Sequence, residues 1–83
     1  MARPDSVEHW WLTFSTAVMP PDAPPVQHQE MRSAFYAGVW ATLTASQQII
    51  GDPEITEDEG VRMLEGWHQE CRAFQRAIHE GKA

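Results

Sequence analysis

Basic side chains recur at helical spacing near the end of the 83-residue chain: His68, Arg72, Arg76 and His79. Steps of four, four and three residues place all four on one side of an α-helix. Guanidinium groups suit phosphate oxygens because their planar fork donates two hydrogen bonds at once. The stripe therefore predicts that His68, Arg72 and Arg76 contact a small anionic ligand. The alternative is a solvated flank, paired with Glu65, Glu80 or a neighbouring subunit.

A second series with the same spacing combines a cation with two aromatic rings: His28, Arg32, Tyr36 and Trp40. Nucleotide bases stack on aromatic rings, while a guanidinium holds phosphate groups. We therefore predict that Arg32, Tyr36 and Trp40 contact a nucleotide-type ligand, with Tyr36 or Trp40 stacking on a base while Arg72 and Arg76 hold its phosphates. In the alternative interpretation, Tyr36 and Trp40 belong to a packing surface with Arg32 at its rim.

Other reactive side chains do not form a recognisable site. His68 and Cys71 supply half of a zinc motif, whereas structural zinc sites use paired Cys and His ligands. The acidic turn DPEITEDEG lacks the glycine at the sixth position of an EF-hand calcium loop. Cys71 and the serines carry no signature of a catalytic nucleophile. We therefore expect no metal, no cofactor and no enzymatic activity.

The elements that must position these residues are helices, because no alternating β-branched run predicts a strand. The sequence predicts one all-α domain with an N-terminal helix, a stiff extended proline-rich linker and an antiparallel helical hairpin, over about residues 6–19, 20–25 and 26–80. Asp5 is the expected N-cap of the N-terminal helix. One face of this helix is apolar: Val7, Trp10, Trp11, Phe14 and Val18.

The hairpin is predicted to contain two helices, Gln27 to Ile50 and Thr56 to His79, joined by an acidic turn. Gly51 is expected to end the first of them with a left-handed cap. Thr56 and Glu59 predict a capping box at the start of the second. That second helix is expected to fray at Gly81 and to bury one apolar stripe: Val61, Leu64, Trp67, Cys71, Phe74 and Ile78.

Apolar side chains cover well over half of the circumference of the helix at Gln27 to Ile50. A lone hairpin cannot bury so wide an arc, and small residues such as Gly38 allow another helix to approach closely. We therefore expect a helical homo-oligomer assembled through this helix.

Charge and composition restrict the partners. Six basic and twelve acidic residues give a net charge of −6, which disfavours direct binding to nucleic acid. The single cysteine excludes an internal disulfide framework and fits a reducing cytoplasm, and the N-terminus has no apolar core of a secretory signal. Residues 33–51 are uncharged, but Gln47 and Gln48 would be costly in a membrane. We expect a cytoplasmic protein without a membrane helix.

The stretch QEMRSAFYAGVWATL, followed by an acidic break and EGVRMLEGWHQECRAFQRAI, resembles short uncharacterised helical-hairpin proteins of tailed bacteriophages and prophages. The match covers about Gln29 to Gly81 and carries over no catalytic residue. It implies a phage accessory protein in the infected bacterial cell, of the kind that counters bacterial defence by binding something. Helical phage proteins of this class include sponges that sequester the nucleotide signals of CBASS and Thoeris immunity.

Together, these observations predict a small binding protein that sequesters a nucleotide-type immune signal at subunit interfaces. The first alternative is an anti-CRISPR-like inhibitor of a defence protein or host regulatory complex, which would use the acidic turn or an aromatic face as its contact. The second is a virion or scaffolding component, which follows from oligomerisation alone.

Overall fold

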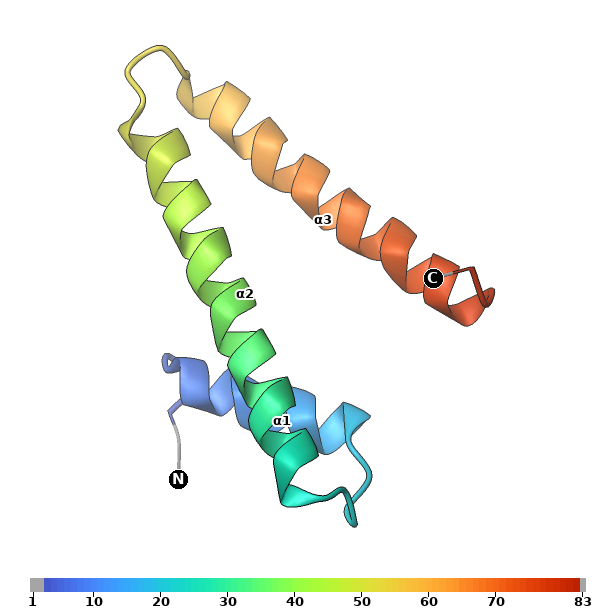
Figure 1. The fold of residues 1–83 in the computed structure, drawn as a ribbon. Coiled ribbons are helices and arrows are strands. Elements are labelled where there is room, and N and C mark those ends of the chain that lie inside the picture. Colours follow the sequence, from blue (N-terminus) through green and yellow to red (C-terminus); the bar gives the residue numbers. More distant parts are fainter. Residues whose placement is uncertain (1–2, 83) are drawn as a thin grey trace. The chain divides into compact units, whose positions relative to one another are not determined.

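The computed structural model describes residues 3–82, which form three α-helices and no β-strand (Figure 1). The helices are α1 (Val7–Val18), α2 (Pro25–Gly51) and α3 (Glu57–His79). The predicted all-α class is confirmed, and each helix begins and ends within two residues of its predicted bounds. The chain divides into two compact units, the first ending at Thr44 and the second beginning at Ala45.

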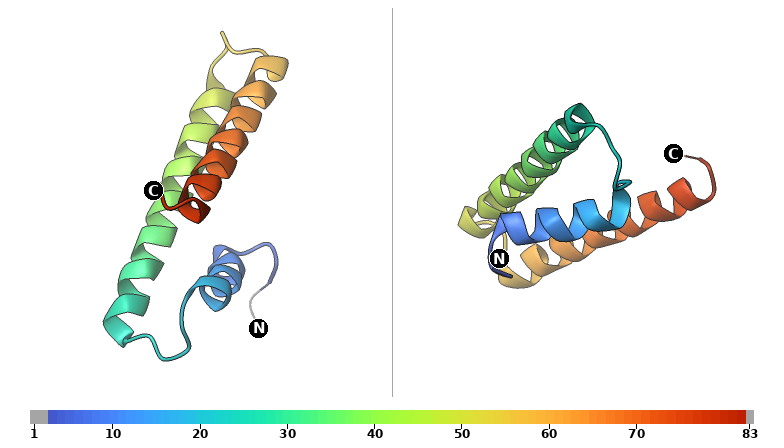
Figure 2. Two further views of the ribbon diagram at one scale, coloured as in Figure 1. Left: turned by 90° about the vertical axis from the view of Figure 1, so that its right-hand side faces the viewer. Right: turned by 90° about the horizontal axis from the view of Figure 1, so that it is seen from below.

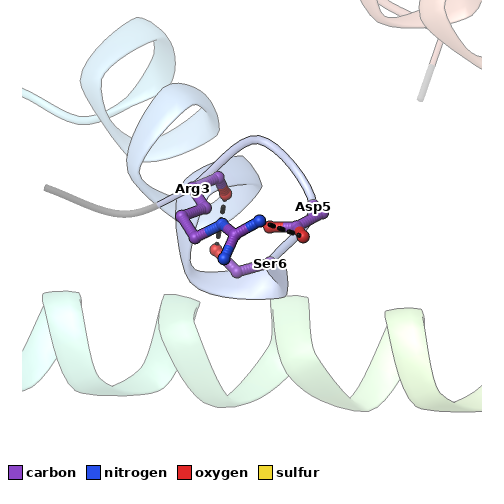
Figure 3. Close-up of polar contacts among 3 residues, drawn as sticks. All are labelled: Arg3, Asp5 and Ser6. Carbon is purple, nitrogen blue, oxygen red and sulfur yellow. Dashed lines mark hydrogen bonds and ion pairs between the residues drawn. The ribbon is translucent and has the colours of Figure 1, made fainter.

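Ser6, rather than Asp5, caps the N-terminus of α1. The Ser6 Oγ accepts a hydrogen bond from the His9 backbone N–H at 3.1 Å, and the hydroxyl donates to the Arg3 carbonyl oxygen at 2.7 Å. The Asp5 carboxylate instead forms an exposed ion pair with Arg3 at 3.3 Å (Figure 3). The prediction of an Asp5 cap is wrong because Ser6 occupies the extended backbone position that precedes the helix.

The proline cluster forms a turn, not the predicted extended linker. The Ala23 N–H donates to the Pro20 carbonyl oxygen at 3.1 Å, which closes a turn over Pro21 and Asp22. Pro25 is the first residue of α2, where its missing N–H costs nothing and its fixed φ suits the helix. Two prolines therefore help to define the turn and the start of α2.

Aromatic rings form the core of the first unit, where α1 crosses the first half of α2 (Figures 1 and 2). The Phe35 ring of α2 lies 5.6 Å from the Trp11 ring and 5.2 Å from the Phe14 ring, measured between centroids. Trp11 is 5% exposed and Met19, just after α1, is 8% exposed. Trp10 and Val18 remain exposed, so only part of the predicted apolar face of α1 is covered.

In the second unit, the turn between α2 and α3 satisfies its own backbone groups. The Asp52 carboxylate accepts from the Glu54 N–H at 2.9 Å, and the Asp52 carbonyl oxygen accepts from the Ile55 N–H at 3.1 Å. Gly51 is the last residue of α2 and has no positive φ, so its predicted left-handed cap is wrong. The Asp52 side chain and Pro53 end the helix without one.

Thr56 caps α3, as predicted. Its Oγ accepts from the Glu59 N–H at 3.2 Å, while its hydroxyl donates to the Glu59 carboxylate at 3.0 Å. Three carboxylates in the first turn, Glu57, Asp58 and Glu59, lie at the positive end of the helix dipole.

The C-terminus of α3 is closed rather than frayed. Gly81 adopts the left-handed conformation with φ of 72°, which glycine tolerates because it has no Cβ. The Lys82 N–H donates to the Ala77 carbonyl oxygen at 2.8 Å, and the Gly81 N–H donates to the Ile78 carbonyl oxygen at 3.1 Å. These two bonds form a Schellman motif.

The predicted burial of the apolar stripe on α3 is wrong for the chain by itself. Val61, Leu64, Phe74 and Ile78 are exposed, as is Cys71, and only Trp67 is half-buried. Ile49 of α2 approaches the first turn of α3, where its Cγ2 lies 3.3 Å from the position of a Cβ built on Gly60. Contact between the last turns of α2 and the first turns of α3 therefore covers one end of the stripe only.

Candidate functional site

The first candidate surface lies on one side of α2 and centres on a cation–aromatic pair. Arg32 and Tyr36 are one turn apart, and the Arg32 Cζ lies 5.5 Å from the centroid of the Tyr36 ring. The Tyr36 ring is half-buried and meets Phe35 edge-on at 6.1 Å, so the aromatic core of the first unit supports it. The helix and the core thus hold a positive charge over a ring face.

An open hollow of about 560 Å³ adjoins this pair and is lined by Gln29, Arg32, Ser33 and Tyr36. All four of these side chains carry hydrogen-bonding groups, and Arg32 is the charged one among them. Trp40 follows on the next turn of α2 and is 69% exposed. A planar, anionic ligand would find a cation, an amide, two hydroxyls and an aromatic ring on one side of α2.

The second candidate surface lies on α3. His68 and Arg72 line an open hollow of about 420 Å³, together with Val61, Leu64, Glu65 and Gln69. Arg76 lies one turn beyond Arg72 and does not line this hollow. All three predicted residues are exposed. The surface therefore combines two aliphatic side chains with a cation, an imidazole, an amide and a carboxylate.

The candidate arginines have no carboxylate partner within residues 3–82. The ion pairs in this range are Arg3 with Asp5 at 3.3 Å and Lys82 with Glu80 at 3.7 Å. Glu80 thus pairs with Lys82 and not with Arg76, and Glu65 forms no ion pair with Arg72. Within residues 3–82, these exposed arginines therefore fit a solvated flank without a carboxylate partner as well as a ligand-binding surface. The guanidinium groups keep their hydrogen-bonding capacity for a ligand or a partner.

The predicted residues divide between the two units. Arg32, Tyr36 and Trp40 belong to the first unit, and His68, Arg72 and Arg76 belong to the second. Arg32 and Tyr36 are in contact, and His68 and Arg72 share a hollow. Each set is therefore a candidate surface on its own.

Sequence reasoning overlooked one hollow of about 430 Å³ in the second unit, beside the acidic turn. Its apolar lining includes Ile49, Ile50, Ile55 and Leu64. The available signal was the presence of three isoleucines around a turn that is otherwise acidic. The acidic residues of the turn predict a solvated surface, whereas its isoleucines line an apolar hollow.

Two negative findings apply to residues 3–82. No three His, Cys, Asp or Glu side chains come together in an arrangement that would hold a metal ion. None of the described helices has the length and apolar character needed to cross a membrane.

Comparison with known proteins adds no constraint on these surfaces. No family model, curated protein or solved structure matches the chain. The function must therefore be inferred from the arginines and aromatic rings of the two candidate surfaces.

Proposed function

We propose that this chain is a small, non-catalytic binding protein that sequesters a nucleotide-type ligand, with Arg32 and Tyr36 at the centre of the site. The observation that carries the proposal is the unpaired Arg32 guanidinium held 5.5 Å from the Tyr36 ring centroid, beside an open hollow. A guanidinium fork binds phosphate oxygens, and exposed rings stack on bases. Both groups lie on one side of α2.

The ligand would be recognised by its charge and by its flat base. Arg32 donates to a phosphate oxygen, while Trp40, which is exposed on the next turn, offers a ring for stacking. Base stacking on an aromatic ring contributes about 1–3 kcal/mol, and a charge-assisted hydrogen bond contributes about 1.5–3 kcal/mol. Together these contacts are sufficient for a micromolar complex only when several act on the same ligand.

His68, Arg72 and Arg76 on α3 are proposed as a second, independent anion-binding surface. Its support is the hollow shared by His68 and Arg72, together with the absence of carboxylate partners for the arginines within residues 3–82.

The assembly proposed for this protein is an antiparallel hairpin of α2 and α3 that forms a homo-oligomer through α2. Three observations support contact with a second copy. Leu43 is exposed, a Cβ at Gly38 would meet nothing within 4 Å, and Gly38 and Leu43 line an open hollow of about 460 Å³. A helix of another copy has room to approach there.

The biological setting that we propose is counter-defence by a phage in the cytoplasm of an infected bacterium. Its support is the resemblance of the RSAFYAG helix and its surroundings to phage and prophage proteins. A sponge for an immune signal needs ligand affinity and no catalysis, which suits a chain of this size.

A second candidate function is the inhibition of a bacterial defence protein or host regulatory complex. The observation that favours it is the large set of exposed apolar side chains, which includes Trp10, Trp40 and Phe74. Aromatic residues of this kind are typical anchors of protein interfaces. A virion or scaffolding role is the third candidate, and only the proposed oligomerisation supports it.

Calorimetry against cyclic dinucleotides, cyclic trinucleotides and ADP-ribose derivatives tests the proposed function. We expect at least one ligand to bind, and we expect Arg32→Ala to weaken its binding about 10- to 100-fold because a charge-assisted contact is lost. Arg62→Ala is the matched control, since it removes an exposed arginine that lines neither hollow. Tyr36→Phe should retain binding, whereas Tyr36→Leu should lose the ring contact.

Native mass spectrometry of protein purified from bacteria with active nucleotide-signalling defence complements the titrations. A retained ligand supports the sponge function and identifies the compound by its mass. If the whole panel gives no heat of binding and a host protein co-purifies instead, the inhibitor function replaces the sponge.

A further inference from the structure

The exposed apolar face of α3 follows a heptad pattern. Six residues are separated by steps of four, three, four, three and four: Gly60, Leu64, Trp67, Cys71, Phe74 and Ile78. Alternating steps of four and three residues repeat every seven residues, as in the seam between two coiled helices. Phe74 is 60% exposed, and Leu64 and Ile78 are exposed as well. The seam therefore has apolar side chains at five of its six positions, and four of them, Cys71 included, are exposed.

We propose that α3 pairs in antiparallel orientation with α3 of a second copy of this chain. In the pairing that centres the two-fold axis on Gln69, Gly60 meets Ile78 of the second copy. Leu64 then meets Phe74, and Trp67 meets Cys71. Two-fold symmetry repeats each of these layers on the other side of the axis.

Side-chain size favours this orientation. Each layer combines a larger residue with a smaller one. Gly60 and Cys71 are the smallest residues of the seam; Gly60 faces Ile78 of the other copy, and Cys71 faces Trp67. In a parallel pair each residue would meet its own copy, so that two indole rings would crowd one layer and two glycines would leave another empty. Close packing disfavours both overfilled and empty layers.

Charge favours the same orientation. The first turn of α3 carries Glu57, Asp58 and Glu59, and the last turn carries Arg76 and His79. Antiparallel pairing places the acidic turn of each copy beside the basic turn of the other and opposes the helix dipoles. A parallel pair would bring like charges together at the acidic end. The Glu70 carboxylates of the two copies lie on either side of the two-fold axis. Because both are exposed, salt screens their mutual repulsion.

This contact goes beyond the proposed ligand binding and uses a different helix from the assembly proposed for α2. The α3 contact can therefore fail while ligand binding through Arg32 persists, or the reverse. Gly38→Glu places a charge on the α2 surface and leaves the α3 seam unchanged. That variant separates the two contacts between copies.

A charge exchange across one layer tests the pairing in the full chain. Leu64→Lys and Phe74→Glu should each weaken dimerisation about 100-fold or more, since each places an unpaired charge in an apolar seam. The double variant Leu64→Lys/Phe74→Glu should dimerise again, because the introduced ammonium of one copy faces the introduced carboxylate of the other. Ala73→Glu adds the same charge on the outward side of α3 and should retain the dimer.

Light scattering and analytical ultracentrifugation give the mass of each variant, and circular dichroism gives its helix content. These variants are compared in the Gly38→Glu background, which disrupts the proposed α2 contact. In that background, a helical monomer for each single variant and a dimer for the double variant support the proposal. A folded wild-type monomer at micromolar concentration overturns it, as does association in the Gly38→Glu background that both single variants leave unchanged. A double variant that stays monomeric overturns the antiparallel pairing, since only that orientation joins the two new charges.

Spin labels decide the orientation if a single variant loses its helix. Gln69→Cys and Arg62→Cys, each in the Cys71→Ser background, place a label on the outward side of α3, either level with the two-fold axis or seven residues away from it. With a rise of 1.5 Å per residue, the labels at position 62 are offset by about 21 Å along the axis, whereas those at position 69 have no offset. Equal separations at the two positions, or no coupling, overturn the proposal.

Discussion

The two units of this chain obtain their order from different sources. The first unit has the rings of Trp11, Phe14 and Phe35 packed between α1 and α2, with Trp11 and Met19 buried. Residues 45–82 contain no buried side chain, yet both ends of α3 are completed by hydrogen bonds. Capping hydrogen bonds therefore set the ends of a helix, whereas a stable pair of helices also needs side chains from both helices that exclude water between them.

Trp11→Ala should have the largest effect, because it removes the main buried side chain of the first unit. We expect a loss of about 3–5 kcal/mol in the free energy of unfolding, the usual range for deletion of a buried aromatic. Hydrogen exchange should show lost protection in α1 and in the first half of α2. Chemical denaturation followed by circular dichroism measures the stability.

Trp10→Ala is the matched control for this prediction, since the neighbouring indole is 55% exposed. Its effect should lie within about 0.5 kcal/mol of wild type, as for most surface substitutions. Equal losses for the two tryptophan variants would contradict the aromatic core described for the first unit.

Thr56→Ala should have an intermediate effect on the second unit. Removal of the hydroxyl that accepts from the Glu59 N–H should lower stability by about 1 kcal/mol, and hydrogen exchange should increase in the first turn of α3. Ser6→Ala removes the equivalent cap of α1 and should cost a similar amount in the first unit.

Thermal unfolding with and without calcium should give the same midpoint, and a large calcium-dependent rise would reassign the acidic turn as a metal loop.

Arg3→Ala should have the smallest effect. The Arg3 and Asp5 side chains are both mainly exposed, so solvent screens their ion pair and the expected change is no more than about 0.5 kcal/mol. The Ser6 cap uses the Arg3 carbonyl oxygen, which the substitution retains. A loss larger than that of Ser6→Ala would show that the ion pair, and not the hydroxyl, orders the start of α1.

The candidate surfaces follow the same division between local and long-range order. Spacing of four residues predicts that Arg32 and Tyr36 share one side of α2 and that His68 and Arg72 share one side of α3. The first pair is in contact and the second pair lines one hollow, because one helical turn separates the members of each pair. Their contacts with a ligand stay a prediction. Residue spacing along α2 does not predict which side chains of the core pack beside the Tyr36 ring. Phe35 packs there, and its place against Trp11 depends on how α1 meets α2.

Apolar periodicity, proline positions and the Thr56 hydroxyl predict the three helices and most of their ends, since each of these signals acts within a few residues. At the remaining ends neighbouring groups compete: Ser6 caps α1 in place of Asp5, and Asp52 ends α2 without a left-handed Gly51. Which apolar side chains are covered depends on contacts between helices. Trp11 is buried and Phe74 is exposed although both lie in apolar stripes. Burial depends on whether another helix reaches the stripe, and periodicity along one helix carries no information about that neighbour.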